Sequence, residues 1–217
     1  MANALEDAAH RTPDDLLIFP CNGNGLEALD CLGERFRVLG FVDDAAGKQG
    51  GVCAGSVVLS RKAFQDFPSA AVLAVPGSPQ SYKVRREIIE SLNIDPDRFA
   101  SVIHPQATVS PLARIGRNVL LMAGVVVTSN AVIGDHVCVL PNTVVHHDVV
   151  VEDWSLVGSN VTLAGGVRLG TNSYIGSGSS VMPGVRVGAG ALVGMGSNVL
   201  RDVEAGGRVA GNPARPV

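Results

Sequence analysis

The sequence has few aromatic residues: one Trp, two Tyr and six Phe among 217 residues. Large rings therefore cannot fill its core, and small aliphatic side chains must do so, which favours a stack of thin coils over a bulky core. Excess positive charge is also missing. The formal net charge of −3 gives no electrostatic basis for binding nucleic acid or an anionic membrane.

Long apolar runs and paired cysteines are missing as well. The chain shows no secretory signal peptide and no apolar run long enough to cross a bilayer. Its four cysteines, Cys21, Cys31, Cys53 and Cys138, are scattered and lack the spacing of a metal site. We therefore expect reduced thiols, no metal, no membrane association and a cytoplasmic location.

What the sequence does contain is a strict six-residue period, in which every sixth residue over about a hundred residues is Val, Ile or Leu. A period of six fits neither an amphipathic helix nor a simple alternating strand, and it is typical of a hexapeptide-repeat parallel β-helix. A valine-rich sandwich would not keep this period. The seventeen aliphatic positions are Ile103, Val109, Ile115, Leu121, Val127, Ile133, Val139, Val145, Val151, Val157, Leu163, Leu169, Ile175, Val181, Val187, Val193 and Val199.

The period also predicts which residues stack. The position two before each aliphatic is small or β-branched, so both side chains should point inward on a short strand. Three hexads make one coil, and residue n should lie over residue n+18. Burying each aliphatic side chain should contribute about 1.5–3 kcal/mol. The residue after the aliphatic is often Gly, which we expect to supply the backbone angles of a tight corner. These glycines are Gly116, Gly134, Gly158, Gly170, Gly176, Gly188 and Gly194.

The first hundred residues follow a different pattern. Short apolar runs alternate with helical stretches, which predicts a small Rossmann-like parallel sheet. The expected division is a flexible leader over 1–14, an α/β domain over 15–100, a β-helix over 101–203 and a C-terminal tail over 204–217. Strands are expected at 16–19, 37–42, 57–59 and 71–75, and helices at 26–32 and 82–92.

Three loops should meet at the carboxyl ends of these strands, where such sheets bind their ligands. The first contains Asn22, Gly23, Asn24 and Gly25, the second is Asp43-Asp44, and the third runs from Pro76 through Gly77 to Ser78. The glycine loop lacks the full dinucleotide fingerprint, so a simple tight turn explains it equally well. The two aspartates could bond a ribose or base, or form a solvated turn, and the sequence leaves both interpretations open.

The repeat region holds the candidate chemistry at His146-His147-Asp148. One coil later the same corner is Ala164-Gly165-Gly166, and the next is Met182-Pro183-Gly184. These small residues leave room for a thin ligand along the prism and a free N–H at Gly165. A base beside a backbone donor and an open groove suits acyl transfer. A merely polar corner is the competing interpretation. We expect His136 to be a surface turn residue and His104 to be structural.

Several stretches together resemble one family. They are Gly40-Phe41-Val42-Asp43-Asp44 after a glycine-rich turn, Val102-Ile103-His104-Pro105, Asn142-Thr143-Val144-Val145-His146-His147-Asp148, and Val209-Ala210-Gly211-Asn212-Pro213-Ala214-Arg215. The order resembles the sugar acyltransferases that include bacterial nucleotide-linked amino-sugar N-acetyltransferases and sialic acid O-acetyltransferases. The resemblance covers nearly the whole chain after about residue 15.

The resemblance implies a homotrimer of left-handed β-helices that uses acetyl-CoA as co-substrate, bound between subunits. The family's catalytic pair falls on His147 and Asp148, and its acetyl-carbonyl donor falls on Gly165. A nucleotide-linked sugar would lie on the three N-terminal loops. Many members carry a second His nine residues after the catalytic one, where this chain has Leu156. The stacking rule extends the acetyl-CoA column through Gly165, Gly166, Pro183 and Gly184 toward Arg201.

These features predict N-acetylation of the 4-amino group of a nucleotide-linked 4-amino-4,6-dideoxysugar. The alternatives are O-acetylation of a sialic-acid-type sugar, a zinc β-helix carbonic anhydrase, or a non-catalytic scaffold. The zinc enzyme needs three imidazoles converging on one ion, and His104, His136 and His147 fall on different corner columns.

Overall fold

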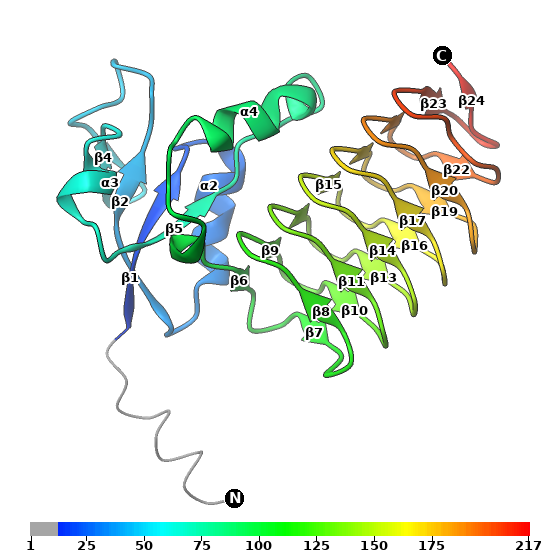
Figure 1. Ribbon diagram of the computed structural model, residues 1–217, viewed down its shortest axis with the longest axis horizontal. Coiled ribbons are helices and arrows are strands. Elements are labelled where there is room, and N and C mark those ends of the chain that lie inside the picture. Colours follow the sequence, from blue (N-terminus) through cyan, green and yellow to red (C-terminus); the bar gives the residue numbers. More distant parts are fainter. Residues whose placement is uncertain (1–12) are drawn as a thin grey trace, which may run out of the picture.

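The computed structural model describes residues 13–217, so most of the expected leader over 1–14 lies outside the described residues. Two units follow one another along the chain, an α/β unit and a β-helix whose coils stack toward the C-terminus (Figure 1). All four cysteines are free. No helix among the described residues is long and apolar enough to span a membrane.

The N-terminal unit is a five-stranded sheet of order β3-β4-β2-β1-β5. Its pairs are parallel except for the short antiparallel pair β3–β4 at one edge, which the sequence analysis missed along with helix α3. The helical elements are short. The strands and helices, including three 3-10 helices, are β1 (Asp14–Phe19), α2 (Gly23–Glu27), η2 (Ala28–Cys31), β2 (Phe36–Val42), β3 (Val52–Cys53), β4 (Ser56–Leu59), α3 (Ala63–Asp66), β5 (Ala71–Ala74), η3 (Tyr82–Val84), α4 (Arg85–Glu90) and η4 (Pro96–Arg98).

The C-terminal unit is the left-handed parallel β-helix that the six-residue period predicts. Its strands form three sheets, and from β6 to β22 every partner lies eighteen residues away, as in Val126 with Val144. Its strands are β6 (Val102–Ile103), β7 (Thr108–Val109), β8 (Arg114–Ile115), β9 (Leu120–Leu121), β10 (Val126–Val127), β11 (Val132–Ile133), β12 (Cys138–Val139), β13 (Val144–Val145), β14 (Val150–Val151), β15 (Leu156–Val157), β16 (Thr162–Leu163), β17 (Arg168–Leu169), β18 (Tyr174–Ile175), β19 (Ser180–Val181), β20 (Arg186–Val187), β21 (Leu192–Val193), β22 (Asn198–Val199), β23 (Arg208–Ala210) and β24 (Arg215–Pro216).

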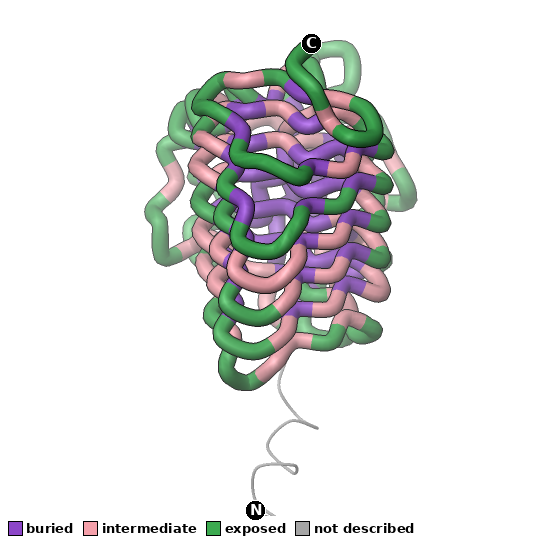
Figure 2. Tube along the Cα trace, turned by 90° about the vertical axis from the view of Figure 1, so that its right-hand side faces the viewer, coloured by how far each residue is buried: buried purple, intermediate pink, exposed green. Residues whose placement is uncertain are grey.

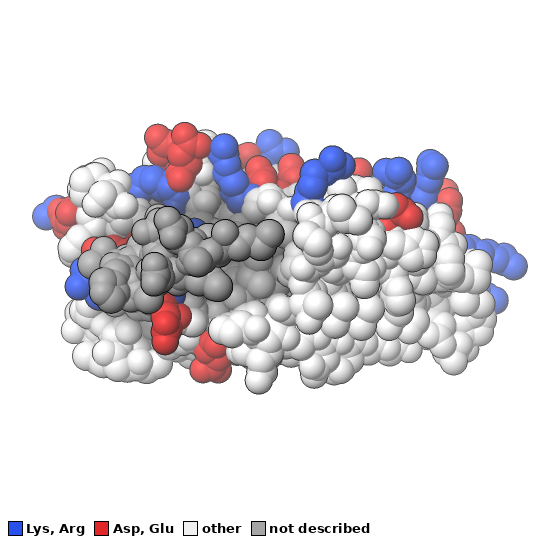
Figure 3. Space-filling model, turned by 90° about the horizontal axis from the view of Figure 1, so that it is seen from below, with Lys and Arg blue, Asp and Glu red and all other residues white. Residues whose placement is uncertain are grey.

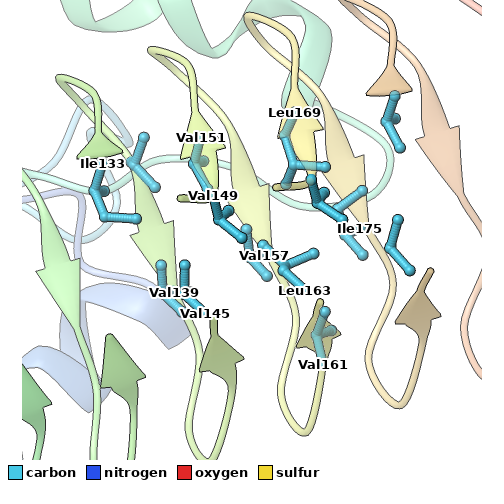
Figure 4. Packing of buried hydrophobic residues seen from close by; sticks show 14 of the residues in the cluster. Ile133, Val139, Val145, Val149, Val151, Val157, Val161, Leu163, Leu169 and Ile175 are labelled. Atoms are coloured by element: carbon cyan, nitrogen blue, oxygen red, sulfur yellow. The ribbon is translucent and has the colours of Figure 1, made fainter. Parts of the chain in front are cut away.

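The interior of the prism is lined by the predicted aliphatic side chains and by the small residues two positions before them, except at the first coil, where Ile103 is 40% exposed and the prediction that it points into the core is wrong. Ile133, Val151 and Leu169 point inward from successive coils (Figure 4). Viewed from the side, the buried residues form a continuous column inside the coils (Figure 2). The residues expected to form a C-terminal tail instead extend one sheet, since β23 pairs with β21 and β24 pairs with β23.

The expected role of the glycines after the aliphatics is wrong. The left-handed backbone conformation falls three residues after the aliphatic, at every sixth residue from Asn118 to Gly196. The glycines instead permit close approach between coils. A Cβ on Gly158 would lie 2.5 Å from the Ser177 nitrogen, and one on Gly176 would lie 2.5 Å from the Met195 nitrogen. Glycine is needed at these positions because the next coil leaves no space for a side chain.

One corner column of the β-helix docks the N-terminal unit. At its base, the buried Asn118 side chain binds the backbone of β5, accepting from the Ala74 N–H at 2.7 Å and donating to its oxygen at 2.8 Å. One coil up, His136 stacks on Trp154 with ring centroids 3.9 Å apart, and Phe99 meets it edge-on. The prediction of a surface role for His136 is therefore wrong, because the N-terminal unit covers this corner.

The same column continues this contact upward. The Asn172 side chain donates to the Lys83 carbonyl at 3.1 Å, and the Tyr82 hydroxyl donates to the Gly190 carbonyl at 3.0 Å. These bonds hold η3 along two successive coils, so the two units are joined by directional contacts as well as by apolar packing.

The docked position of His136 makes stability depend on pH. Burial, followed by the nearby Arg85 charge, lowers the pKa of His136 to about 4, whereas an unfolded histidine titrates near 6.5. As pH falls from about 6.5 toward 4, the unfolded chain binds a proton that the folded chain does not. The folded state should lose about 2 kcal/mol from this source between pH 7.5 and pH 5.

The matched variant is His136→Asn, because Asn occupies the same left-handed corner at positions 118 and 172. Urea unfolding at fixed protein concentration, at pH 7.5 and pH 5, should show a smaller acid-induced loss of stability in the variant. Equal losses in both proteins would contradict the assignment.

Candidate active site

The catalytic candidate lies at the corner between β13 and β14. His147 follows β13 and is exposed, with 65% of its side chain accessible, and its Nδ1 lies 2.8 Å from Asp148 Oδ2. The other carboxylate oxygen of Asp148 accepts a hydrogen bond from the Asn130 side chain at 3.1 Å. Hydrogen bonds from His147 and then from Asn130 lower the pKa of Asp148. The carboxylate is therefore ionised at neutral pH.

This arrangement selects one nitrogen of the imidazole. An ionised carboxylate only accepts hydrogen bonds. His147 Nδ1 must therefore carry a proton and donate a hydrogen bond to Asp148. The lone pair then lies on Nε2 when the ring is neutral. A Cβ placed on Gly165, one coil later, would lie 2.6 Å from Nε2. The Cε1–Nε2 edge of the ring therefore lies against Gly165.

The backbone around Gly165 offers a donor beside that base. The Gly166 N–H donates to the His147 carbonyl at 3.0 Å, and the Gly184 N–H donates to the Gly165 carbonyl at 3.0 Å. Within residues 13–217, no protein acceptor binds the Gly165 N–H. A free N–H next to a free imidazole nitrogen can stabilise a carbonyl oxygen while the base takes a proton.

The predicted acetyl-CoA column lies along the same corner. Pro183 and Gly184 are exposed above Gly166, with the Gly184 Cα 3.9 Å from where a Cβ of Gly166 would be. The column leads toward Arg201, which is exposed and lines a cavity of about 260 Å³ at the C-terminal end of the prism.

Charged side chains gather at that end of the prism, where Asp202 and Glu204 line the cavity beside three arginines. Arg201, Arg208 and Arg215 all line the same cavity, together with the β23–β24 hairpin. Arginine binds phosphate groups in a bidentate manner, so this end suits a phosphorylated ligand.

The three N-terminal loops meet, as predicted, at the carboxyl ends of β1, β2 and β5. In the first loop, Asn22 caps α2 by accepting from the Gly25 N–H at 3.1 Å. The Asn24 side chain donates to the Val75 carbonyl at 3.3 Å, joining the first loop to the third. Gly23 is open, because a Cβ there would have no atom within 4 Å.

The two aspartates of the second loop are engaged by the protein. Asp43 is 5% exposed, and its oxygens accept from the N–H groups of Cys21 and Ala45 and from Lys48 Nζ at 2.9–3.0 Å. Burial acts to raise its pKa, but these bonds and the Lys48 charge outweigh it and hold the pKa below its usual value. Asp43 is therefore not part of a solvated turn, and its carboxylate oxygens are already hydrogen-bonded within the protein.

Its neighbour Asp44 is also paired, since Arg61 donates to both of its oxygens at 2.7 and 2.8 Å. Lys48 is an exposed cation beside the first loop, and its Nζ donates to the Cys21 carbonyl as well as to Asp43. Sequence reasoning missed Lys48 because its position five residues after Asp43 marks no motif.

A cavity of about 190 Å³ lies between the first and third loops and the outer face of the eight-stranded sheet. Asn24, Gly77 and Ser78 contribute one wall. The other wall is apolar and includes Leu156, which is 6% exposed. Leu156 lies against Gly77, since a Cβ on that glycine would be 2.7 Å from Leu156 Cδ1.

Among residues 13–217, no group of three or more His, Cys, Asp or Glu side chains could hold a metal ion. His104, His136 and His147 lie at separate places, the first in a turn where its Nδ1 accepts from the Gln106 N–H. The geometry gives no support to a zinc centre within one copy of the described chain.

Two hexapeptide-repeat families match the β-helix. The model described as "Bacterial transferase hexapeptide (six repeats)" matches residues 112–146 and 130–165, and "Hexapeptide repeat of succinyl-transferase" matches 148–183 and 166–201. The acetyltransferase domain of PglB from Neisseria gonorrhoeae FA1090 is 30% identical, with a TM-score of 0.81, over 94% of this chain and 99% of that chain. The chain belongs to the hexapeptide-repeat sugar acyltransferases. Among curated proteins, a sequence search finds no match.

Two further structures resemble this acyltransferase over nearly its whole length. Perosamine N-acetyltransferase from Caulobacter crescentus, solved as a variant with CoA and GDP-perosamine, is 27% identical with a TM-score of 0.82, over 95% of this chain and 98% of that chain. WeeI from Acinetobacter baumannii AYE is also 27% identical, with a TM-score of 0.77, over 95% of this chain and all of that chain. The likeness therefore includes both units of the acyltransferase.

Proposed function

We propose that this acyltransferase moves the acetyl group of acetyl-CoA onto the 4-amino group of a nucleotide-linked 4-amino-4,6-dideoxysugar. One observation carries the proposal: the Cε1–Nε2 edge of the His147 ring lies against Gly165, while Asp148 binds Nδ1. The likeness to proteins solved with CoA and GDP-perosamine or with acetyl-CoA supports the choice of substrates.

In the proposed reaction, the neutral amine attacks the thioester carbonyl carbon, and a C–N bond forms. His147 Nε2 takes a proton from the attacking nitrogen, and the Gly165 N–H donates to the carbonyl oxygen as charge develops there. The C–S bond then breaks, and the imidazolium returns its proton to the leaving sulfur. Asp148 remains ionised throughout and stabilises the imidazolium that forms.

The nucleotide would bind at the three N-terminal loops, beside Asn24, Gly77 and Ser78 and within reach of Lys48. The sugar would enter the cavity between these loops and the β-helix. Leu156 makes that cavity apolar, which suits the methyl group of a 6-deoxysugar.

We also propose that the active protein is a homotrimer, because the corner of His147 is open in a single copy. The outward positions of the six-stranded sheet are small and uncharged, and one face of the β-helix shows few charged side chains (Figure 3). Such a face can pack against a second copy without burying unpaired charge. The outward residues are Thr108, Val126, Val144, Thr162, Ser180 and Asn198. Light scattering should give three times the chain mass, and a monomer mass would contradict the trimer.

A thermal-shift screen tests the substrate class. Nucleotide-linked 4-amino-4,6-dideoxysugars at about a hundred times Kd should raise the melting temperature by about 5–10 °C in the presence of CoA. The free nucleotides and nucleotide-linked sugars without an amino group are the controls. If no amino sugar raises the melting temperature beyond its free nucleotide, the proposed acceptor is wrong.

A further inference from the structure

The first residue of α4, Arg85, is a fully buried cation at the boundary of the two units. Its Nε donates to the Pro76 carbonyl at 2.8 Å, and its Nη1 donates to the His136 carbonyl. Neither acceptor is charged. Within residues 13–217 no carboxylate forms an ion pair with it, and its Nη2 has no hydrogen-bond partner.

Burying this guanidinium costs free energy of folding, so an arginine at this position needs an explanation that a neutral side chain would not. A buried charge without a counter-charge loses its hydration, and apolar replacements of similar size are often at least as stabilising. Burial lowers the pKa of Arg85 to about 10, which leaves the group protonated at neutral pH. Stability of the fold alone therefore does not explain why this position holds an arginine.

The two acceptors of Arg85 belong to different units. Pro76 begins the third loop, with one residue between it and the end of β5, whereas His136 belongs to the corner column of the β-helix. The planar guanidinium fork fixes both carbonyls in one geometry, which a flexible point donor such as lysine cannot do. Arg85 thus connects the loop to the β-helix through a single rigid group.

The part of the loop that Arg85 holds is the rim of the 190 Å³ cavity. A Cβ on Gly77 would lie 3.2 Å from Arg85 Cδ and 2.7 Å from Leu156 Cδ1. Gly77 is therefore packed against both of these side chains. Gly77 also has a φ of +136°, which only glycine adopts readily. The backbone of this rim is therefore set by Arg85 on one side and by the β-helix on the other.

We propose that Arg85 is a positioning residue for the acceptor: it fixes the loop from Pro76 to Ser78 against the β-helix and so sets the shape of the acceptor cavity. This inference rests on the proposed function, because the cavity is taken as the acceptor site. In this role, Arg85 does not contact acetyl-CoA and does not transfer a proton.

The test compares three variants of the full-length protein. Arg85→Met keeps the apolar stem and removes the fork, and Arg85→Lys keeps the charge but not the planar pair of donors. Arg86→Met is the matched control, because Arg86 is the next residue of α4 but is exposed and paired with Glu90. Steady-state kinetics are measured for both substrates, and amide hydrogen exchange is measured over residues 76–81.

Arg85→Met should raise KM for the nucleotide-linked amino sugar by about tenfold to a hundredfold, with KM for acetyl-CoA and kcat nearly unchanged. Arg85→Lys should fall between this variant and the wild type, and Arg86→Met should match the wild type. Exchange over residues 76–81 should accelerate in Arg85→Met without any substrate present.

A fall in kcat with both KM values unchanged would show a purely structural role and overturn the inference. Unchanged exchange with an unchanged acceptor KM would also overturn it. If Arg85→Met does not fold, Arg85→Lys carries the same comparison. If the wild type acetylates no nucleotide-linked amino sugar, the proposed function fails, and the exchange measurement still decides whether Arg85 holds the loop.

Discussion

Replacing His147 by Asn is expected to lower kcat by about 10²–10⁴-fold, the usual cost of losing a general base. Asparagine retains a polar side chain at the corner but has no group that can take a proton from an amine near neutral pH. KM for acetyl-CoA should change little, because the Gly165 and Gly184 backbone of the column is untouched. Initial rates of CoA release at saturating concentrations of both substrates measure the effect.

The neighbouring histidine provides the matched control. His146 follows β13 directly, and its backbone N–H donates to the Leu163 carbonyl at 3.0 Å. Among residues 13–217, no carboxylate pairs with its ring as Asp148 pairs with His147. His146→Asn should therefore keep kcat near that of the wild type. If His146→Asn is the inactive variant and His147→Asn is active, the assignment of the base is wrong.

Replacing Gly165 by Ala is expected to lower kcat by about a hundredfold, because the added methyl group displaces the catalytic imidazole. The new Cβ would lie 2.6 Å from both Cε1 and Nε2 of His147, so the ring must move from its position beside Asp148. From the sequence, Gly165 is expected to provide the acetyl-carbonyl donor and to belong to the acetyl-CoA column. The structure adds that even the smallest side chain there acts on the base.

A larger side chain separates the two roles of this position. Gly165→Leu should also raise KM for acetyl-CoA, because its side chain extends into the groove, whereas Gly165→Ala should affect mainly kcat. Gly47→Ala is a suitable control, since a Cβ there meets no atom within 4 Å. Wild-type kcat in Gly165→Ala would mean that the imidazole does not act from the position that the structure shows.

The repeat region could be predicted in detail because its stacking is periodic. Because three six-residue repeats make one coil, residue n+18 stacks over residue n. Applying this rule once places Gly165 over His147. The same rule contains Asn130, which lies eighteen residues before Asp148 and binds it. The corner Thr128-Ser129-Asn130 is recognisable from the sequence as the one before that of His147, but stacking alone does not show that the Asn130 amide binds Asp148.

The contacts between the two units could not be predicted in this way. His136 follows a glycine-containing corner that resembles a surface turn, and only docking of the N-terminal unit buries it against Trp154. Asp43 looks like a free ligand group after a strand, yet the loop returns Lys48 and two backbone N–H groups to it. Arg85 looks like a solvated helix residue. These roles depend on packing between distant segments, which no local pattern encodes.

The most direct test of the central claim is acetyl transfer itself. Purified protein is incubated with acetyl-CoA and a nucleotide-linked 4-amino-4,6-dideoxysugar, and the product is analysed by mass spectrometry before and after treatment with alkaline hydroxylamine. The account predicts one acetyl group per sugar, released CoA in equal amount, and an amide that survives the treatment. An acetyl group that hydroxylamine removes would indicate an ester and O-acetylation, and the absence of transfer to any such amino sugar would contradict the proposed function.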